Sequence, residues 1–158
     1  FGSGALFLGF GMFYHRYKER SISQLSGLGT QMPVFSGFFM LFTFSTIGVP
    51  FTAGFVGEWM VIVSAVQNVP WLGILSAVSI ILAAIYLLNM YQSVFFGVPK
   101  TSLVALPDLY KGEVLILSLV ALVIIGLGIY PNPMIKVLTP SAKGLISVST
   151  ASKIGVLV

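Results

Sequence analysis

Four long apolar blocks follow one another along the chain, with short polar segments between them. The stretch from Ser21 to Pro99 holds one charged residue, and the stretch from Val114 to Ile135 holds none. About 20 apolar residues cross a hydrocarbon core of roughly 30 Å as a helix. We therefore predict an all-α, polytopic membrane protein. The predicted helices lie at about 1–15, 32–68, 72–97 and 113–131, and a C-terminal tail follows at 136–158.

The second block is too long for one ordinary crossing, because its 37 residues would form a helix of about 55 Å. Either two helices turn back on each other at VPFTAG, or a single crossing is broken near 48–54. A turn in water is normally polar, whereas this segment offers only Thr52. The apolar turn favours the broken crossing.

The distribution of basic residues favours the same alternative. A hairpin would place HRYKER and the loop between Lys100 and Lys111 on opposite faces of the membrane. A broken crossing instead gathers five basic residues on one face and three on the other, and Lys/Arg-rich loops mark the cytoplasmic or matrix side. The five are Arg16, Lys18, Arg20, Lys100 and Lys111, and the three are Lys136, Lys143 and Lys153.

Composition agrees with a membrane protein. Of the 158 residues 57% are hydrophobic and 8% are charged, against about 25% charged in soluble domains. The net charge of +4 comes from scattered residues, so we expect no nucleic-acid partner. The lack of cysteine excludes disulfides, iron–sulfur ligation and thiol chemistry in this chain. Because the sequence starts inside a predicted helix, we expect residues 1–158 to be a single membrane domain fragment of a longer protein.

Glu58 is the lone charge of the second and third blocks, within IGVPFTAGFVGEW. A carboxylate at the centre of a spanning helix costs about 2.5–3.5 kcal/mol on insertion scales, and such acids are usually functional. The alternative is a carboxylate near the interface or in a structural hydrogen bond. Burial favours the neutral acid, while the start of a helix favours the ionised form. We expect Glu58 to be a proton relay.

The predicted break has a mechanism in the residues around it. Pro50 lacks an N–H, and its ring would collide with the carbonyl of Thr46 in a continuous helix. Freed backbone groups cannot face lipid, so they must face protein or a wet cavity. Discontinuous helices of this kind mark ion sites in transporters. Four hydroxyl groups could supply partners: Thr43, Ser45, Thr46 and Thr52.

A second polar feature lies near the end of the third predicted helix, where Tyr86, Asn89 and Gln92 recur every three residues. Packing between helices through small and polar contacts is the favoured interpretation. The functional alternative is the lining of a water wire, with Tyr86 and Asn89 as candidates. His15 lies among basic residues at a helix end, where a solvated loop histidine is favoured over a relay.

Several segments together resemble one protein family. They are FYHRYKER, MPVFSGFFMLFTFSTIGVPFTAGFVGEW, YLLNMYQSVFFG, DLYKGEVLIL and GIYPNP. They resemble the C-terminal third of the chain 4 family of NADH:ubiquinone oxidoreductase (respiratory complex I), over residues 1 to about 145. The resemblance implies a fourteen-helix, antiporter-like fold built from two inverted repeats, of which this chain holds the last four helices. It also implies that the twelfth helix is discontinuous.

The resemblance further implies what the chain does. Glu58 matches the acidic residue of the exit half-channel, in a proton-pumping subunit that carries no cofactor. NADH, FMN, Fe–S clusters and ubiquinone would belong to other subunits. The implied partners are other complex I membrane subunits, especially neighbouring antiporter-like subunits, an upstream chain with the missing helices, and lipids. The implied location is the mitochondrial inner membrane, with a bacterial inner membrane as the alternative. A multisubunit cation/proton antiporter and a structural scaffold are the competing functions.

Overall fold

The computed structural model describes residues 1–17, 26–98, 107–133, 135–137 and 139–140. Within these ranges the chain is helical and contains no strand, which confirms the predicted all-α class. The helices are α1 (Gly2–Tyr17), α2 (Leu28–Gln31), α3 (Pro33–Ile47), α4 (Ala53–Asn68), α5 (Pro70–Phe95) and α6 (Lys111–Ile129). Much of the predicted tail, as well as Lys18, Arg20 and Lys100, lies outside the described residues.

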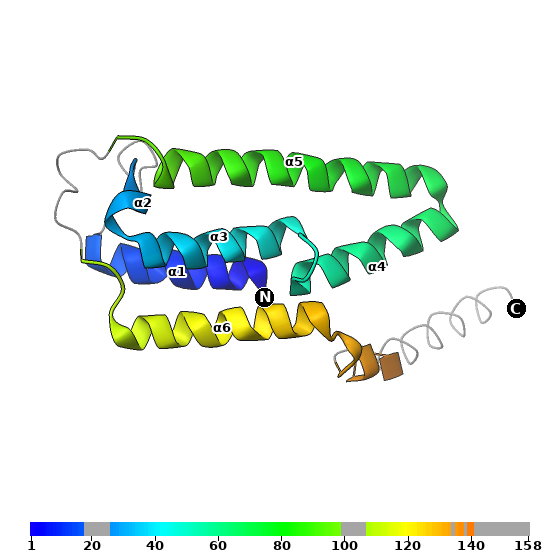
Figure 1. Ribbon diagram of the computed structural model, residues 1–158. Coiled ribbons are helices and arrows are strands. Elements are labelled where there is room, and N and C mark those ends of the chain that lie inside the picture. Colours follow the sequence, from blue (N-terminus) through cyan, green and yellow to red (C-terminus); the bar gives the residue numbers. More distant parts are fainter. Residues whose placement is uncertain (18–25, 99–106, 134, 138, 141–158) are drawn as a thin grey trace, which may run out of the picture.

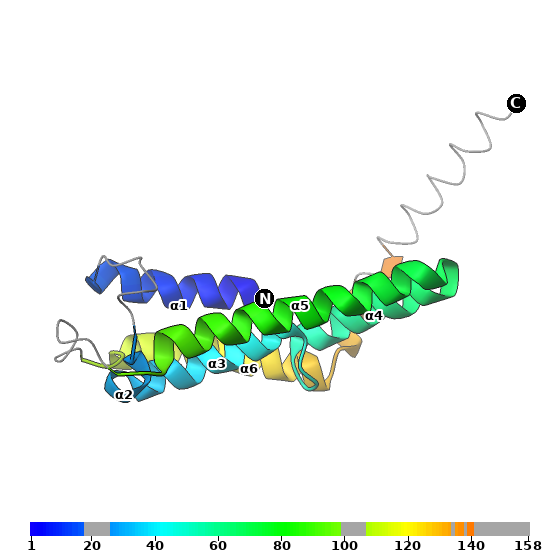
Figure 2. The same cartoon turned by 90° about the horizontal axis from the view of Figure 1, so that it is seen from above.

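The second apolar block forms two helices, α3 and α4, that run on in the same direction (Figures 1 and 2). The chain reverses only after α4, so that α5 runs back alongside both of them. The discontinuous helix predicted from the sequence is therefore confirmed, and a hairpin at residues 48–54 is not what forms. The helical path is interrupted from Gly48 to Thr52.

Two helices have the length and the apolar composition of a membrane span. Among the described residues α5 and α6 are long and apolar enough to cross a bilayer. The helices α3 and α4 have 15 and 16 residues, or about 22 and 24 Å, and neither alone spans a core of about 30 Å. Placed end to end, they make one crossing.

The ends of the helices follow local chemistry. α5 begins two residues before its predicted start because Pro70 occupies its first turn, where a missing N–H costs nothing. α6 likewise begins before residue 113, because the Glu113 carboxylate accepts a hydrogen bond from the Tyr110 N–H at 2.9 Å and so starts the first turn. Asp108 caps α3 from outside, since its carboxylate accepts hydrogen bonds from Val34 N (2.9 Å) and Phe35 N (3.3 Å).

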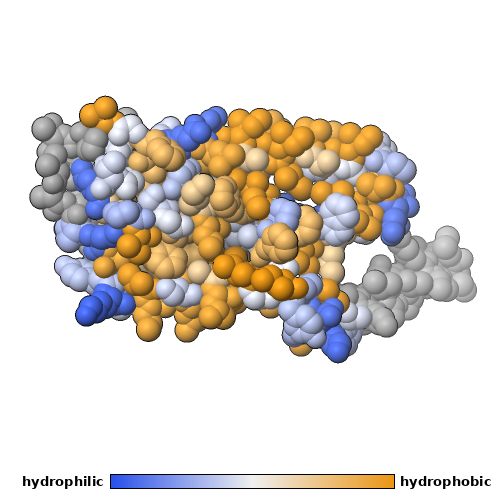
Figure 3. Space-filling view, viewed as in Figure 1, coloured by the Kyte–Doolittle hydropathy of each residue, from blue (hydrophilic) through white to orange (hydrophobic). Residues whose placement is uncertain are grey.

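Aromatic rings fill the core beside α3. Phe35 and Phe39 pack on Phe95 with ring centroids 5.8 and 5.1 Å apart, and Tyr91 stacks on Phe95 at 4.6 Å. The Tyr91 hydroxyl lies 2.8 Å from the Ser36 hydroxyl, which adds a polar contact between α3 and α5. In lipid, such van der Waals packing and interhelical hydrogen bonds hold helices together. Outside this core, hydrophobic residues cover much of α5, while hydrophilic residues gather mainly toward the two ends of the molecule (Figure 3).

Candidate functional site

The break between α3 and α4 is a compact turn in which several backbone groups find partners. The N–H groups of Gly48 and Val49 both donate to the Phe44 carbonyl, the latter at 3.0 Å. Thr52 closes the turn, because its N–H (3.2 Å) and its hydroxyl (2.7 Å) both donate to the Val49 carbonyl. Three of the backbone N–H groups at the break, those of Gly48, Val49 and Thr52, therefore have partners within it, which lowers the cost of interrupting the helix in lipid.

The turn also contains two residues with positive φ. Gly48 has φ 81°, which glycine adopts without strain, and Phe51 has φ 71°. A non-glycine residue in this region is uncommon and costs energy. The Phe51 side chain is 72% exposed, so packing of its ring does not hold this conformation.

Glycines let the neighbouring helices approach the break closely. A Cβ atom at Gly54, in the first turn of α4, would collide with the Ser45 carbonyl oxygen of α3. A Cβ atom at Gly128, near the end of α6, would collide with the backbone of Phe51 and Thr52. The position of α4 is therefore set by backbone-to-backbone contacts on two sides.

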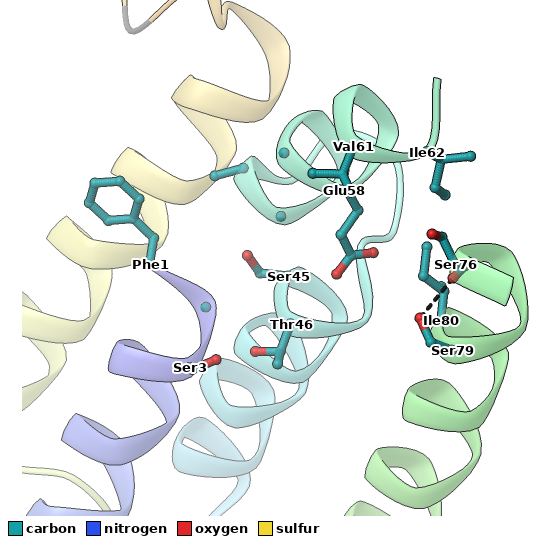
Figure 4. Close-up of a pocket in the computed structure, with 14 residues that line it drawn as sticks. Phe1, Ser3, Ser45, Thr46, Glu58, Val61, Ile62, Ser76, Ser79 and Ile80 are labelled. Carbon is teal, nitrogen blue, oxygen red and sulfur yellow. Dashed lines mark hydrogen bonds between the residues drawn. The ribbon is translucent and has the colours of Figure 1, made fainter. Parts of the chain in front are cut away.

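Glu58 lies on α4, and its partly buried side chain reaches back to the end of α3. Its carboxylate packs against Gly48, where a Cβ atom would collide with Oε2. Within the described part of the chain, nothing forms an ion pair or a hydrogen bond with this carboxylate. The acid thus stands at the discontinuity itself, facing a cavity (Figure 4).

The cavity is a pocket of about 470 Å³ that lies between α1, α3, α4 and α5 and is open to the outside. Five residues that carry hydroxyl groups line it beside the carboxylate, although the Ser45 oxygen itself is fully buried: Ser3, Ser45, Thr46, Ser76 and Ser79. A water molecule occupies about 30 Å³ in the liquid and needs two to four polar partners in a protein. The cavity therefore has both the room and the polar groups to hold several waters next to Glu58.

The site can provide hydrogen-bond partners for Glu58 in both of its protonation states. An ionised carboxylate accepts hydrogen bonds from water, and a protonated carboxyl donates one. The last carbonyls of α3 are among the acceptors that a helix end leaves free. The arrangement can take up a proton and pass it on, whereas it offers no nucleophile with a base. No cluster of three His, Asp or Glu residues occurs in the described ranges to hold a metal.

Ser45 stands out among the lining residues. It is 1% exposed, and its hydroxyl has no hydrogen-bond partner on the described protein. Its neighbours behave differently, since Thr43 and Thr46 donate to the carbonyls of Phe39 and Phe42 at 2.8 and 2.9 Å. An unpartnered buried hydroxyl costs about 1–3 kcal/mol.

The structure brings only some of the residues predicted from the sequence together. Thr46 lines the cavity with Glu58, and Thr52 stabilises the turn. Pro50 is exposed in the turn and does not line the cavity. Tyr86 and Thr46 line a second groove of about 300 Å³ between α1, α3 and α5, while Asn89 is exposed and lines neither space.

Three serines of the cavity were not singled out as site residues from the sequence. Ser3 starts α1, and Ser76 and Ser79 lie one turn apart on α5. Ser76 has apolar sequence neighbours, so its hydroxyl did not stand out as part of a site. The sequence offered one indication of these serines: Ser76 and Ser79 lie three residues apart and so share one face of the helix.

Known proteins with similar sequences and structures come from one group. The family model described as "NADH:quinone oxidoreductase/Mrp antiporter, TM" matches residues 1–85. NADH-quinone oxidoreductase subunit M of Rhodobacter capsulatus is 35% identical over 147 residues, which cover 92% of this chain and 29% of that protein. NADH-ubiquinone oxidoreductase chain 4 of Marchantia polymorpha is 35% identical over 145 residues, covering 91% and 29%.

A solved structure agrees with these relatives. The chain superimposes on part of "Respiratory complex I from Thermus thermophilus with bound NADH" with a TM-score of 0.78 and 27% identity, covering 90% of this chain and 30% of that one. The chain thus spans about 30% of the length of the proteins that it matches.

Proposed function

This chain belongs to the NADH:quinone oxidoreductase/Mrp antiporter transmembrane family, and on that premise we propose that it is the C-terminal part of a proton-translocating membrane subunit of respiratory NADH:quinone oxidoreductase. In this proposal it contributes the exit half-channel of a proton path. The fourteen-helix fold and the single-domain organisation predicted from the sequence belong to the same proposal.

One observation carries the proposal: a carboxylate lies at the break of a discontinuous helix and faces a cavity lined by hydroxyl groups. We assign Glu58 the role of proton relay, in which it takes a proton from one water and releases it to another. Thr46 contributes a hydroxyl to the same cavity, and Pro50 and Thr52 shape the break. Tyr86 extends the polar lining into the neighbouring groove, whereas the position of Asn89 gives less support for a part in the path.

The rest of the pump would lie in other chains or other parts of the protein. We propose that NADH, FMN, Fe–S clusters and ubiquinone bind to other subunits and drive proton transfer here from a distance. The partners would be complex I membrane subunits, foremost the neighbouring antiporter-like ones, with an upstream segment supplying the missing helices and lipids covering the apolar faces.

The energy-coupling inner membrane is the proposed location. The mitochondrial inner membrane expected from the sequence stays a prediction, because the relatives in Rhodobacter and in Marchantia are equally similar at 35% identity. A cation/proton antiporter remains the second candidate, since the description of the family model includes antiporters. The relatives named above favour the oxidoreductase.

Replacement of Glu58 by Gln tests the proposal in the assembled complex. The amide keeps the size of the side chain but cannot carry a proton, so proton pumping coupled to NADH oxidation should fall by about tenfold or more. Pumping would be measured as protons moved per NADH in membrane vesicles, with assembly followed on native gels.

Glu113→Gln is the matched control, because it makes the same change at the start of α6, outside the cavity. The Gln oxygen can still accept the hydrogen bond from Tyr110 N, so pumping and assembly should be unchanged. Normal pumping in Glu58→Gln, with normal assembly, would instead indicate a structural scaffold.

A further inference from the structure

We propose that protons leave Glu58 along one side of α4, past Val61 and through a second groove lined by Ser64 and Asn68. In this exit route Val61 is an apolar gate, and the other two side chains hold water. The inference rests on the proposed function, because it concerns where the proton goes once Glu58 releases it. It adds a direction and three residues to that function.

A second groove begins where the cavity of Glu58 ends. It has a volume of about 460 Å³ and lies beside the connection between α4 and α5. Val61 lines both the cavity and this groove, so the two spaces meet at its side chain. Ser64 and Asn68 line the groove beyond Val61. The two spaces together therefore follow α4 from the break to its last residue.

The two sides of α4 differ in character, because residues three, four and seven positions apart share one side of a helix. One side carries polar and small residues: Gly54, Gly57, Glu58, Ser64, Ala65 and Asn68. The opposite side carries larger apolar residues: Phe55, Val56, Trp59, Val63 and Val66. Val61 lies on the polar side, between Glu58 and Ser64. Since polar side chains within a membrane face protein or water rather than lipid, this side suits a wet path.

The polar groups of the groove can hold water molecules. The Asn68 Nδ2 atom donates to the Ser64 carbonyl at 2.8 Å, which orients the amide and leaves its oxygen to accept a hydrogen bond from water. The Ser64 side chain is exposed, and a hydroxyl can both donate to water and accept from it. The groove thus offers water both donors and acceptors beyond Val61.

The groove also leads in the direction that an exit requires. Asn68 lies ten residues after Glu58, or about 15 Å along the helix, which is half of a hydrocarbon core of about 30 Å. α4 ends at the opposite end of the molecule from the start of α6 (Figure 1). The larger group of basic residues flanks the start of α6 in the sequence, and Lys/Arg-rich loops lie on the cytoplasmic or matrix side. The groove therefore opens toward the outer side.

The proton would move along this route through water. Protonated Glu58 gives its proton to a water in the cavity, which breaks the carboxyl O–H bond and leaves the carboxylate. Each further water accepts one proton and hands on another, so Ser64 and Asn68 hold waters without changing their own charge. Val61 offers no hydrogen bond, and an apolar constriction gates a pore by excluding water. Its side chain thus limits the return of protons to Glu58.

Labelling of Ser64→Cys in the assembled complex tests whether the groove is wet. The chain contains no cysteine, so this variant gives it one thiol. A cationic, impermeant methanethiosulfonate added from the outer side should modify the thiol, as measured by mass spectrometry, and should lower the number of protons pumped per NADH several-fold.

Val66→Cys is the matched control for this labelling. Val66 is 46% exposed and lies two residues nearer the end of α4, but on the apolar side. If distance from the membrane surface alone decided the reaction, Val66→Cys would react more readily than Ser64→Cys. We expect it to stay unmodified, whereas an unreactive Ser64→Cys would overturn the exit route.

Substitutions of Val61 test the gate. Val61→Thr keeps the shape of the side chain but makes the constriction polar, so the passive proton leak of vesicles without NADH should rise. Val66→Thr makes the same change on the apolar side and should leave the leak unchanged. Val61→Phe should lower pumping per NADH by about fivefold or more, because a larger apolar group excludes more water. An unchanged leak in Val61→Thr overturns the gate, also where Val61→Phe does not assemble.

The outcomes separate this route from the proposed function. Loss of pumping in Glu58→Gln, together with an unreactive Ser64→Cys, overturns the route while the function stands. Normal pumping in Glu58→Gln overturns the function, whereas a modified Ser64→Cys and an unmodified Val66→Cys would still support a wet path along α4.

Discussion

Gly48 joins the backbone of the break to the chemistry of the acid. Its φ of 81° lies in the left-handed region, and its Cα lies against the Glu58 carboxylate. A side chain at this position therefore meets two obstacles: the conformation, which costs an L-residue about 1 kcal/mol or more, and the carboxylate. Glycine allows the acid to sit at the end of α3.

We predict that Gly48→Ala displaces the Glu58 carboxylate and lowers proton pumping several-fold in a complex that still assembles. Gly97→Ala is the control, because Gly97 also has a positive φ (105°) and, among the described residues, its Cβ would meet only the Ser26 hydroxyl. Both variants should lower the free energy of unfolding by about 1 kcal/mol or somewhat more. Only Gly48→Ala should lower the number of protons pumped per NADH. Equal pumping in the two would show that contact with the carboxylate has no role.

At the residue scale, the sequence identified the acid but not its surroundings. Glu58 was recognisable because a lone charge in an apolar block is costly. Ser76 and Ser79 were not, since a serine in a membrane helix usually donates back to its own backbone, as both do here. Which hydroxyl is left without a partner, as Ser45 is, depends on a side-chain direction that no pattern encodes.

Among the elements, α6 supports the break through a single glycine. The two glycines of the GLG sequence at 126–128 have different surroundings. A Cβ at Gly128 would collide with the backbone of Phe51 and Thr52, which cannot yield as a flexible side chain could. A Cβ at Gly126 would meet no atom of the described residues within 4 Å.

We therefore predict opposite results for Gly128→Ala and Gly126→Ala. The first should push the turn away from α6, expose the break to proteolysis or chemical labelling, and lower the yield of assembled complex. The second should be neutral or slightly stabilising, because alanine favours a helix over glycine by about 1 kcal/mol. Native gels and limited proteolysis would check this, and similar behaviour of the two variants would contradict the contact at Gly128.

The existence of most elements was predictable, while their ends and spacing were less so. Pro50 and the apolar turn around it predicted the interruption of the second block. The short helix α2 before Pro33 was not predicted, because four residues carry no hydrophobic period. The cap of α3 by Asp108 joins residues more than 70 positions apart, and such a contact depends on how the helices assemble.

For the whole molecule, the interrupted crossing fixes which segments share a side of the membrane. The C-terminal ends of α1 and α5 lie on the same side as the N-terminal end of α6. The turn between α4 and α5 lies at the opposite end of the molecule (Figure 1). Because the chain contains no cysteine, single cysteines can report these positions.

His15→Cys and Tyr110→Cys should react with an impermeant maleimide from one side of the membrane, and Asn68→Cys from the other. Labelling of this chain would be measured by mass spectrometry in vesicles of both orientations. A hairpin in place of the interrupted crossing would give a different result, with His15→Cys and Tyr110→Cys reacting from opposite sides.

The connection between α4 and α5 has a mechanical consequence. Only Val69 separates the two helices, and Gly73 brings the backbone of α5 against Val66 of α4. The connection to α3, by contrast, is the five-residue turn from Gly48 to Thr52. A force that tilts α5 is therefore transmitted directly to α4 through this one-residue connection. Because Glu58 lies on α4, its carboxylate would move with α4 relative to Gly48 at the end of α3.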